Sequence, residues 1–163
     1  MASDITLEVV GEKQGEITGE GKRASTAYID LEGFSLGGTV LMDGAGLPTK
    51  RRVYRPVAVS KATDVTSPRL WSAFANNEML SVKLISRKQS GSSTEGLQFY
   101  SIELGKARIV SIESMQSKSG VPIDEISFVF ETVEITYDEQ RGKGPGAGLG
   151  RGIVSFHDQW SEQ

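Results

Sequence analysis

Apolar and polar residues alternate along most of this chain. Near its start, Ile5, Leu7 and Val9 are separated by Thr6 and Glu8. A period of two places the apolar side chains on one face of an extended strand and the polar side chains on the other. The same alternation predicts further strands over residues 27–32, 80–85, 99–104 and 107–113.

Glycine-rich stretches separate the predicted strands. The chain has 19 glycines among 163 residues, well above the ordinary share of about 7%. They cluster in a predicted extended loop over about 37–50 and in a tail loop over 142–152, after which a short last strand is expected over 153–156. Many short strands joined by glycine turns predict an all-β fold, a small barrel or a sandwich.

Two predicted strands carry irregularities. Pro56 lies within the strand predicted over 53–59, and because proline has no N–H it indicates an edge strand or a bulge. The longest predicted strand covers 125–137, where the apolar face switches between Phe130 and Val133. Such a switch indicates a bulge, or a strand that is buried on both faces.

One segment has the pattern of a helix. Ser67 is a good N-cap residue, and Pro68 follows at the first helical position, where a missing N–H costs nothing. The apolar stripe that follows consists of Leu70, Trp71 and Phe74. We therefore predict one short α-helix over about 67–77 that packs on the strands, with Trp71 in the core.

Composition and charge exclude several classes of protein. The length matches one domain of about 150 residues, here 1–163. The absence of cysteine excludes disulfides, thiol catalysis and cysteine metal sites. A net charge of −3 lacks the basic excess that nucleic-acid binding requires. No signal peptide and no apolar run of about 20 residues is present, so we expect cytoplasmic folding without membrane insertion.

Candidate catalytic chemistry is sparse. His157 is the single histidine, so a Ser-His-Asp arrangement would have to use it. The glycine run over 142–150 lacks the spacing of a phosphate-binding loop. Glu131 and Glu134 could form a carboxylate pair for hydrolysis, but alternating acidic residues are more typical of a solvated sheet face. We expect no enzyme activity, no metal and no cofactor.

Several features indicate an assembled protein. Lys50, Arg51 and Arg52 form a short basic cluster that is either solvated or paired with an acidic patch on a neighbouring subunit. Trp160, in the tail, is hard to place in a monomer and is a candidate interface residue. The strand over 125–137 carries apolar residues on both faces, and outward apolar residues need a helix or another subunit to cover them. These observations predict oligomerisation.

Several stretches together resemble one known family. The most distinctive resembles a Lys-x-x-Asp-x-x-Ser-Pro-x-Leu run that leads into a single helix. Its matching residues are Lys61, Asp64, Ser67, Pro68 and Leu70. Further stretches that agree in order are residues 15–20, 28–37, 99–104, 109–112 and 126–137. The pattern resembles the Hcp family, which forms the tube of bacterial type VI secretion, although Phe34 stands where the family often has Trp.

The resemblance implies a small Hcp-like β-barrel with one helix on its flank. It also implies a homohexameric ring with a wide channel, and rings that stack into a tube inside a contractile sheath, tipped by a VgrG spike. The channel would carry or chaperone effector proteins. The protein would assemble in the cytoplasm and then be secreted through the type VI system without a signal peptide.

This resemblance assigns roles to two sets of residues. Residues of the extended loop would reach an adjacent ring or subunit. They are Gly37, Gly38, Gly44, Gly46, Lys50 and Arg51. Ser111 and Glu113 alternate with Val110 and Ile112, so we expect Ser111 and Glu113 to face the channel.

Three alternatives stay open at this point. A phage-type tail tube protein shares the barrel and the ring, but the Ser67-Pro68 helix start favours Hcp. A monomeric barrel could bind a small ligand in its interior, which a monomeric state and an apolar cavity would indicate. A carboxylate-based hydrolase would need two acidic residues in one cleft with perturbed protonation.

Overall fold

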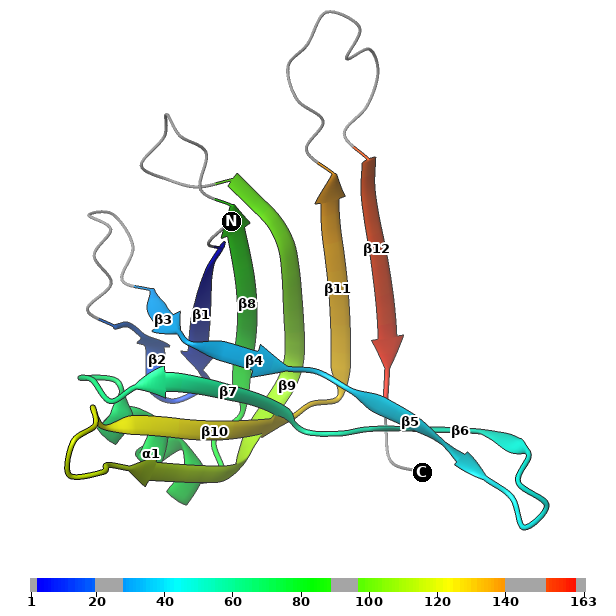
Figure 1. The fold of residues 1–163 in the computed structure, drawn as a ribbon, viewed down its shortest axis with the longest axis horizontal. Helices are drawn as coiled ribbons and strands as arrows, with labels where there is room; N and C mark the ends of the chain where they lie inside the picture. The colour runs from blue at the N-terminus through cyan, green and yellow to red at the C-terminus, as the bar shows by residue number, and fades with distance from the viewer. Residues whose placement is uncertain (1–2, 20–27, 89–96, 140–151, 161–163) are drawn as a thin grey trace, which may run out of the picture.

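The computed structural model describes four stretches of the chain, residues 3–19, 28–88, 97–139 and 152–160 (Figure 1). In chain order their elements are β1 Ser3–Gly11, β2 Gly15–Ile17, β3 Ile29–Leu31, β4 Gly33–Ser35, β5 Gly38–Met42, β6 Pro48–Tyr54, β7 Val57–Ala62, α1 Ser67–Ala75, β8 Leu80–Lys88, β9 Leu97–Met115, β10 Ile123–Val129, β11 Thr132–Glu139 and β12 Gly152–Gln159. Within these stretches no helix has the length and apolar character needed to cross a membrane.

Five strands form the first layer, side by side in the order β1, β8, β9, β11 and β12 (Figure 1). β1 and β8 pair antiparallel along their whole length, from Ser3 opposite Lys88 to Gly11 opposite Leu80. β8 and β9 are also antiparallel neighbours. The strands predicted around residues 5–9 and over 80–85, 99–104 and 153–156 are therefore confirmed as β1, β8, part of β9 and β12.

β9 bends and connects the two layers of the fold. Its first part pairs with β8 and β11, whereas residues 108–115 pair with β10, which in turn pairs with β7. At the bend, Lys106 has a φ of 47°, which is uncommon for a residue with a side chain. Gly105 has no room for one, because a Cβ there would lie 2.1 Å from Thr132 Oγ1. Figure 1 shows the second layer running across the strands of the first.

A short segment joins the far ends of the two layers. β3 pairs with β1, and β4, which follows directly, pairs with β7. Between them, the Glu32 N–H donates to the carbonyl oxygen of Ser60 at 2.8 Å. The strands thus follow one another around a common interior, and the prediction of an all-β barrel with one helix is confirmed.

Apolar side chains from both layers fill this interior. In β1, Leu7 and Val9 are buried while the intervening Glu8 is half-buried. Each such side chain stabilises the fold by roughly 1.5–3 kcal/mol when it leaves water. The largest fully buried apolar residues are Leu7, Ile29, Leu70, Leu80, Leu84, Ile102, Leu104, Ile126 and Phe128.

Two strands predicted as continuous are each divided. The stretch over 125–137 forms β10 and β11, and the chain passes from one layer to the other at Phe130 and Glu131, where the Glu131 N–H donates to the Gly105 oxygen at 3.1 Å. The apolar switch noted in the sequence marks this change of layer. The stretch over 53–59 is likewise divided between β6 and β7, at Pro56.

The helix lies where the sequence predicts it, with two differences. α1 covers Ser67–Ala75 and is followed by Asn76, but its N-cap is Thr66, so the prediction of Ser67 as the cap is wrong. The residues that α1 buries are Ser67, Leu70 and Ala73. Trp71 is 40% exposed, so its predicted place in the core is wrong. The face of α1 toward the barrel is thus formed by residues three apart, Ser67, Leu70 and Ala73, and not by the larger aromatic side chains.

Candidate functional surfaces

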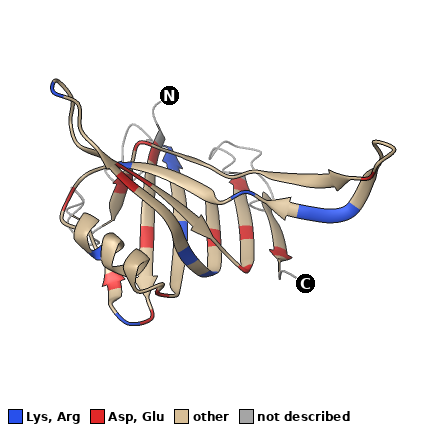
Figure 2. Ribbon diagram, turned by 90° about the horizontal axis from the view of Figure 1, so that it is seen from below, with Lys and Arg blue, Asp and Glu red and all other residues tan. Residues whose placement is uncertain are grey.

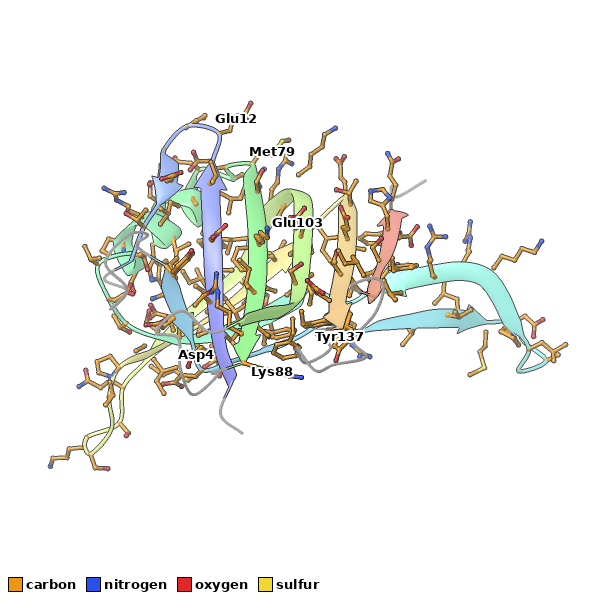
Figure 3. All side chains as sticks on the ribbon, turned by 90° about the horizontal axis from the view of Figure 1, so that it is seen from above. Asp4, Glu12, Met79, Lys88, Glu103 and Tyr137 are labelled. Atoms are coloured by element: carbon orange, nitrogen blue, oxygen red, sulfur yellow. The ribbon has the colours of Figure 1, made fainter. Side chains whose placement is uncertain are left out.

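The segment over 37–50 builds a projecting hairpin, which we call the arm (residues 38–54). β5 and β6 pair with each other, from Gly38 opposite Tyr54 to Met42 opposite Pro48. Figures 1 and 3 show the arm extending beyond the barrel. The predicted extended loop is therefore largely strand, with Gly37 just before it at its base.

A tight turn closes the tip of the arm. The Oδ1 atom of Asp43 accepts hydrogen bonds from the N–H groups of Ala45 and Leu47, both at 2.9 Å. Gly46 has a φ of 78°, a conformation that glycine adopts without steric cost. Gly44 has open space around it. Of the two tip glycines, only Gly46 is therefore required by backbone conformation.

An ion pair anchors the base of the arm to β12. Arg52 donates from Nε and Nη2 to the two carboxylate oxygens of Asp158, at 2.5 and 2.6 Å, and the Tyr54 hydroxyl donates to the same carboxylate at 2.5 Å. The Tyr54 ring packs against Phe130 and Trp160, at centroid distances of 5.4 and 6.1 Å. Trp160, a candidate interface residue, thus packs within its own chain.

The same contacts at the base of the arm shift the pKa values of Asp158 and Tyr54. Hydrogen bonds from Arg52 hold the pKa of Asp158 below its usual value, against the opposing effect of burial. Burial, followed by the hydrogen bond to Asp158, raises the pKa of Tyr54. Both groups therefore keep their ordinary charge states at neutral pH, and the anchor is a carboxylate held by a guanidinium and a neutral phenol.

The rest of the arm is exposed. Its apolar side chains are accessible to solvent, with Met42 70% exposed. The exposed apolar residues are Val40, Leu41, Met42 and Leu47. Lys50 and Arg51 are exposed as well, and neither side chain forms an ion pair within the described stretches. An isolated two-stranded hairpin is marginal in water, so this surface suits contact with another chain.

Ser111 and Glu113 lie on the outward face of the second layer. They are directly opposite Ser127 and Glu125 on β10, and directly opposite residues share a face of the sheet. We call this surface the polar face. Its residues are Ser35, Ser60, Ser111, Glu113, Glu125 and Ser127. They line a shallow hollow of about 300 Å³.

Of the two apolar neighbours of Ser111 expected to point inward, only the one that follows it does so. Ile112 is half-buried and packs on the core, as predicted. Val110 is instead 48% exposed, so its expected inward position is wrong. The register between β9 and β10 shifts between Ser127 and Phe128, and a bulge there leaves Val110 out of the inward row.

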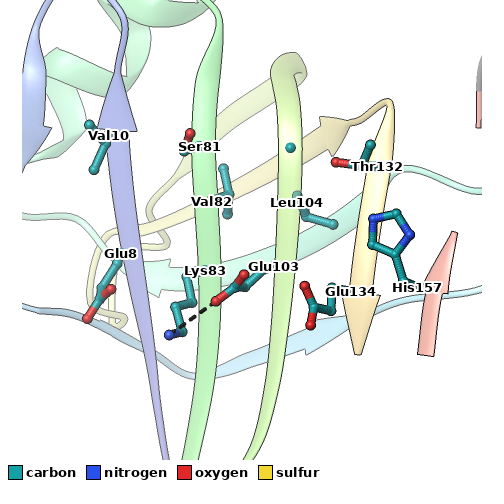
Figure 4. A pocket seen from close by; sticks show the side chains of 11 residues that line it. Glu8, Val10, Ser81, Val82, Lys83, Glu103, Leu104, Thr132, Glu134 and His157 are labelled. Carbon is teal, nitrogen blue, oxygen red and sulfur yellow. Dashed lines mark ion pairs between the residues drawn. The ribbon is translucent and has the colours of Figure 1, made fainter. Parts of the chain in front are cut away.

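A row of charged residues crosses the outward face of the first layer (Figure 4). Glu8 is opposite Lys83, Lys83 opposite Glu103, Glu103 opposite Glu134, and Glu134 opposite His157. Lys83 Nζ lies 3.2 Å from Glu103 Oε1, and the row lines an open hollow of about 340 Å³. This arrangement is that of a solvated sheet face, and no described hydrogen bond joins His157 to a serine.

The distinctive motif residues meet under the start of α1. Lys61 is 0% exposed. Its Nζ lies 2.9 Å from the Ala62 oxygen, 3.1 Å from Asp64 Oδ1 and Ser67 Oγ, and 3.2 Å from Asp124 Oδ2. A buried charge is tolerated only when it is paired and hydrogen-bonded, and here both conditions are met.

Asp124 completes the group from the other side. Its Oδ1 accepts hydrogen bonds from Thr63 and Ser114 at 2.9 and 2.7 Å, and its Oδ2 accepts one from Ser67 at 2.5 Å. Burial acts to raise the pKa of Asp124, but these hydrogen bonds and the one from Lys61 outweigh it, and the pKa lies below its usual value. We call Lys61, Thr63, Asp64, Ser67, Ser114 and Asp124 the buried polar network.

The buried polar network explains the motif structurally. Lys61 on β7, Asp124 on β10 and Ser67 in α1 come from three elements, so their hydrogen bonds fix the helix against the second layer. Leu70 continues the same contact into the hydrophobic core. Because Lys61 and Asp124 are fully buried, the charged centre of the network is closed to a substrate, and the network holds the fold.

Sequence reasoning misses Asp124, although the pattern contains a signal for it. Asp124 has the same parity as Ile126 and Phe128, which point inward. Lys61 has the same parity as the buried Val59. A charged residue at an inward position of each of two strands, one basic and one acidic, indicates a buried pair.

Glu78 is a second buried acid that the sequence does not single out. Its Oε1 accepts the backbone N–H groups of Lys13 and Gln14 at 2.6 and 2.7 Å, and its Oε2 accepts the Gln14 side-chain amide at 2.8 Å. Burial acts to raise the pKa of Glu78, but the hydrogen bonds from Gln14 and Lys13 outweigh it and the pKa is lowered. Glu78 thus ties the turn between β1 and β2 to the segment after α1.

Comparison with known proteins gives concordant results. The chain is 27% identical over 148 residues to the Major exported protein of Pseudomonas aeruginosa, covering 84% of this chain and 86% of that protein. The structure of an Hcp1 mutant from E. coli EAEC 042 superposes with a TM-score of 0.81 at 18% identity, covering 98% of this chain and all of that one. The secreted protein Hcp3 of Pseudomonas aeruginosa superposes with a TM-score of 0.72 at 21% identity, covering 99% and 100%.

The fold and its surfaces define a class, a small β-barrel with a projecting hairpin arm and one helix on its flank. Residues 7–137 match the family described as type VI secretion system effector, Hcp. That range is most of the chain, and the chain belongs to this family. Membership makes it a component of type VI secretion, as a tube or secreted protein.

Proposed function

We propose that this chain is the tube subunit of a type VI secretion system. Six copies form a ring, rings stack into the expelled inner tube, and the ring's channel carries or chaperones effector proteins. The observation that carries the proposal is the polar face. Small hydroxyls and two carboxylates cover the outward side of an otherwise apolar layer, and such a surface suits the wall of a water-filled channel.

The arm supports assembly independently of the polar face. It exposes four large apolar side chains on a hairpin with no buried face of its own. Contact with a neighbouring ring or subunit would cover them, with the tip turn at Gly44 and Gly46 and the basic side chains of Lys50 and Arg51 in that contact. The contractile sheath and the VgrG spike are the further partners on this proposal, and the protein is a structural component rather than an enzyme.

A ligand-binding monomer is the alternative from a different class. Its ligand would occupy the barrel interior, but apolar side chains such as Leu7, Ile102 and Phe128 fill that space. The two hollows described above lie on outward faces. These observations favour the ring over the monomeric binding protein.

The channel position of the polar face is tested by thiol labelling. Because the chain has no cysteine, Ser111→Cys and Ser81→Cys each introduce a single thiol, on the outward faces of opposite layers. In assembled protein we expect a small maleimide to label both variants, and a bulky polyethylene glycol maleimide to label Ser111→Cys much more slowly than Ser81→Cys. Equal rates with the bulky reagent, in protein that electron micrographs show as rings, would contradict a channel position for Ser111.

A further inference from the structure

The two flanks of the first layer differ in charge. The arm is anchored on β12 through Asp158, at one end of the strand order. β2 and β3 both pair with β1, on the side away from β8, at the other end. Figure 1 shows β2 and β3 on one side of the barrel and the arm on the other. The width of the whole layer therefore separates these two surfaces within one chain.

The second strand of the arm carries a basic stretch, whereas the tip turn carries the exposed Asp43. Lys50 and Arg51 are exposed on β6, and neither has an ion-pair partner in the stretches that the structure describes. Arg52 already forms an ion pair with Asp158 of the same chain. Figure 2 shows this basic stretch on the arm. Two cations are thus available to a partner, next to the exposed Val40 and Leu41.

The opposite flank is acidic. Glu16 on β2, Asp30 on β3 and Glu32 directly after β3 are all exposed, and none forms an ion pair within the described residues. We call these three residues the acidic edge. Basic residues near the edge in the sequence are Lys13, in the turn before β2, and Lys22 and Arg23, which lie outside the described residues. From β8, Arg87 donates a hydrogen bond to Thr6, which is directly opposite Asp30. The edge thus carries an excess of negative charge in the part of the chain described.

We propose that the arm of one copy docks on the acidic edge of a second copy, with Lys50 and Arg51 facing the three carboxylates. The proposal rests on the ring proposed above and names the surfaces that close it. A contact between different surfaces of two identical chains is heterologous, and it generates a ring when the rotation between copies closes. Pairing two arms with each other would instead place like charges together, which disfavours a symmetric dimer.

The charged and apolar parts of the contact have different tasks. Exposed ion pairs contribute about 0.2–1 kcal/mol each, and charges at an interface rim mainly set orientation and association rate. The apolar residues of the arm supply most of the affinity, because docking removes their large apolar surface from contact with water. Reversing both cations therefore weakens assembly roughly tenfold rather than abolishing it, and the effect diminishes at high salt.

Cysteine cross-linking tests the docking geometry directly. Arg51→Cys and Asp30→Cys are made as separate variants in the cysteine-free chain, each purified, and then mixed under mild oxidation. We expect a disulfide-linked dimer in the mixture and none in either variant alone, and a ladder up to six copies when one chain carries both changes. Cross-links in a single variant would overturn the heterologous arrangement, and so would the absence of cross-links in the mixture when the protein is hexameric.

Charge reversal gives a second readout that separates this docking from the ring itself. The arm variant Lys50→Glu with Arg51→Glu, and the edge variant Glu16→Lys with Asp30→Lys and Glu32→Lys, should each weaken assembly, and their combination in one chain should restore it. Lys118→Glu, in the exposed loop between β9 and β10, is the matched control. If the unchanged chain is hexameric but neither reversal weakens it, the docking is wrong while the ring stands. If the unchanged chain is monomeric, the ring proposal itself fails.

Discussion

Two ion pairs in this molecule have similar chemistry and opposite environments. Lys61 and Asp124 are both 0% exposed, between β7, β10 and α1. Arg52, in contrast, is 51% exposed where it meets Asp158 at the base of the arm. A buried pair leaves an uncompensated charge in the interior when one partner is lost, whereas an exposed pair is replaced by water. The first pair therefore holds the barrel, and the second sets only where the arm lies.

The largest effect is expected at the buried pair. Lys61→Ala should lower the free energy of unfolding by about 3–5 kcal/mol, because Asp124 then remains buried without its cation. Urea unfolding followed by circular dichroism measures the loss. Lys106→Ala is the matched control, since Lys106 is 63% exposed and lies 3.5 Å from Glu131, and it should change stability by less than about 1 kcal/mol.

The double replacement Lys61→Met with Asp124→Leu sharpens this prediction. Removing both charges leaves no uncompensated charge at position 124. Asp64, the other acidic partner of Lys61, is partly exposed to water, so most of the loss should be recovered. A double variant as unstable as Lys61→Ala would show that the neutral hydrogen bonds of Thr63, Ser67 and Ser114, rather than the buried charge, dominate the buried polar network.

An intermediate effect is expected at Glu78, which is buried but bonded to backbone rather than to a cation. Glu78→Gln should cost about 1–3 kcal/mol at neutral pH, because hydrogen bonds to a charged acceptor are lost. The folded-state pKa of Glu78 lies below its ordinary value of 4.5. Its contribution is therefore complete above that ordinary value and is lost as the pH falls through the lower folded-state value.

The pH dependence supplies the test for Glu78. The free energy of unfolding of the unchanged chain should decline with acid below about pH 4.5, and Glu78→Gln should flatten part of this decline. Asp124 and Asp158, whose pKa values are also lowered, should account for the rest of the decline in the variant. An identical slope in the variant would contradict the stabilising role given to the Glu78 carboxylate.

The smallest effect on stability is expected at the exposed pair. Arg52→Ala should leave the unfolding midpoint nearly unchanged, while amide hydrogen exchange in residues 38–54 becomes faster because the arm loses its anchor. Arg51→Ala, which removes a neighbouring cation without a described partner, should leave that exchange unaltered in the monomer. A loss of stability comparable to that of Lys61→Ala would contradict the distinction between the two pairs.

The same comparison shows what the sequence can predict. Alternation identifies β1, β8 and β9 because each has one buried face, and the Pro68 start and the Asn76 end locate α1. The arm escapes this reasoning because every residue of β5 is exposed, so no alternation arises. A hairpin without a buried face has the composition of a loop.

Contacts between residues that are far apart in the chain are the second feature that the sequence pattern does not reveal. Ser67 has the local pattern of an N-cap, but its hydroxyl donates to Asp124, 57 residues away in the chain, which no local pattern reveals. Trp71 is large and apolar, yet the smaller Ala73 takes the face toward the barrel. The family resemblance places Lys61, Asp64 and Ser67 in one motif, and the fold shows that these three side chains are hydrogen-bonded in the buried polar network.

The central claim is that six copies of this chain form a ring, and the most direct test is the mass of the purified protein in solution. Multi-angle light scattering behind a sizing column should give six times the 17.6 kDa chain, or multiples of that mass from stacked rings. A single species at the mass of one chain, at concentrations well above micromolar, would contradict the claim.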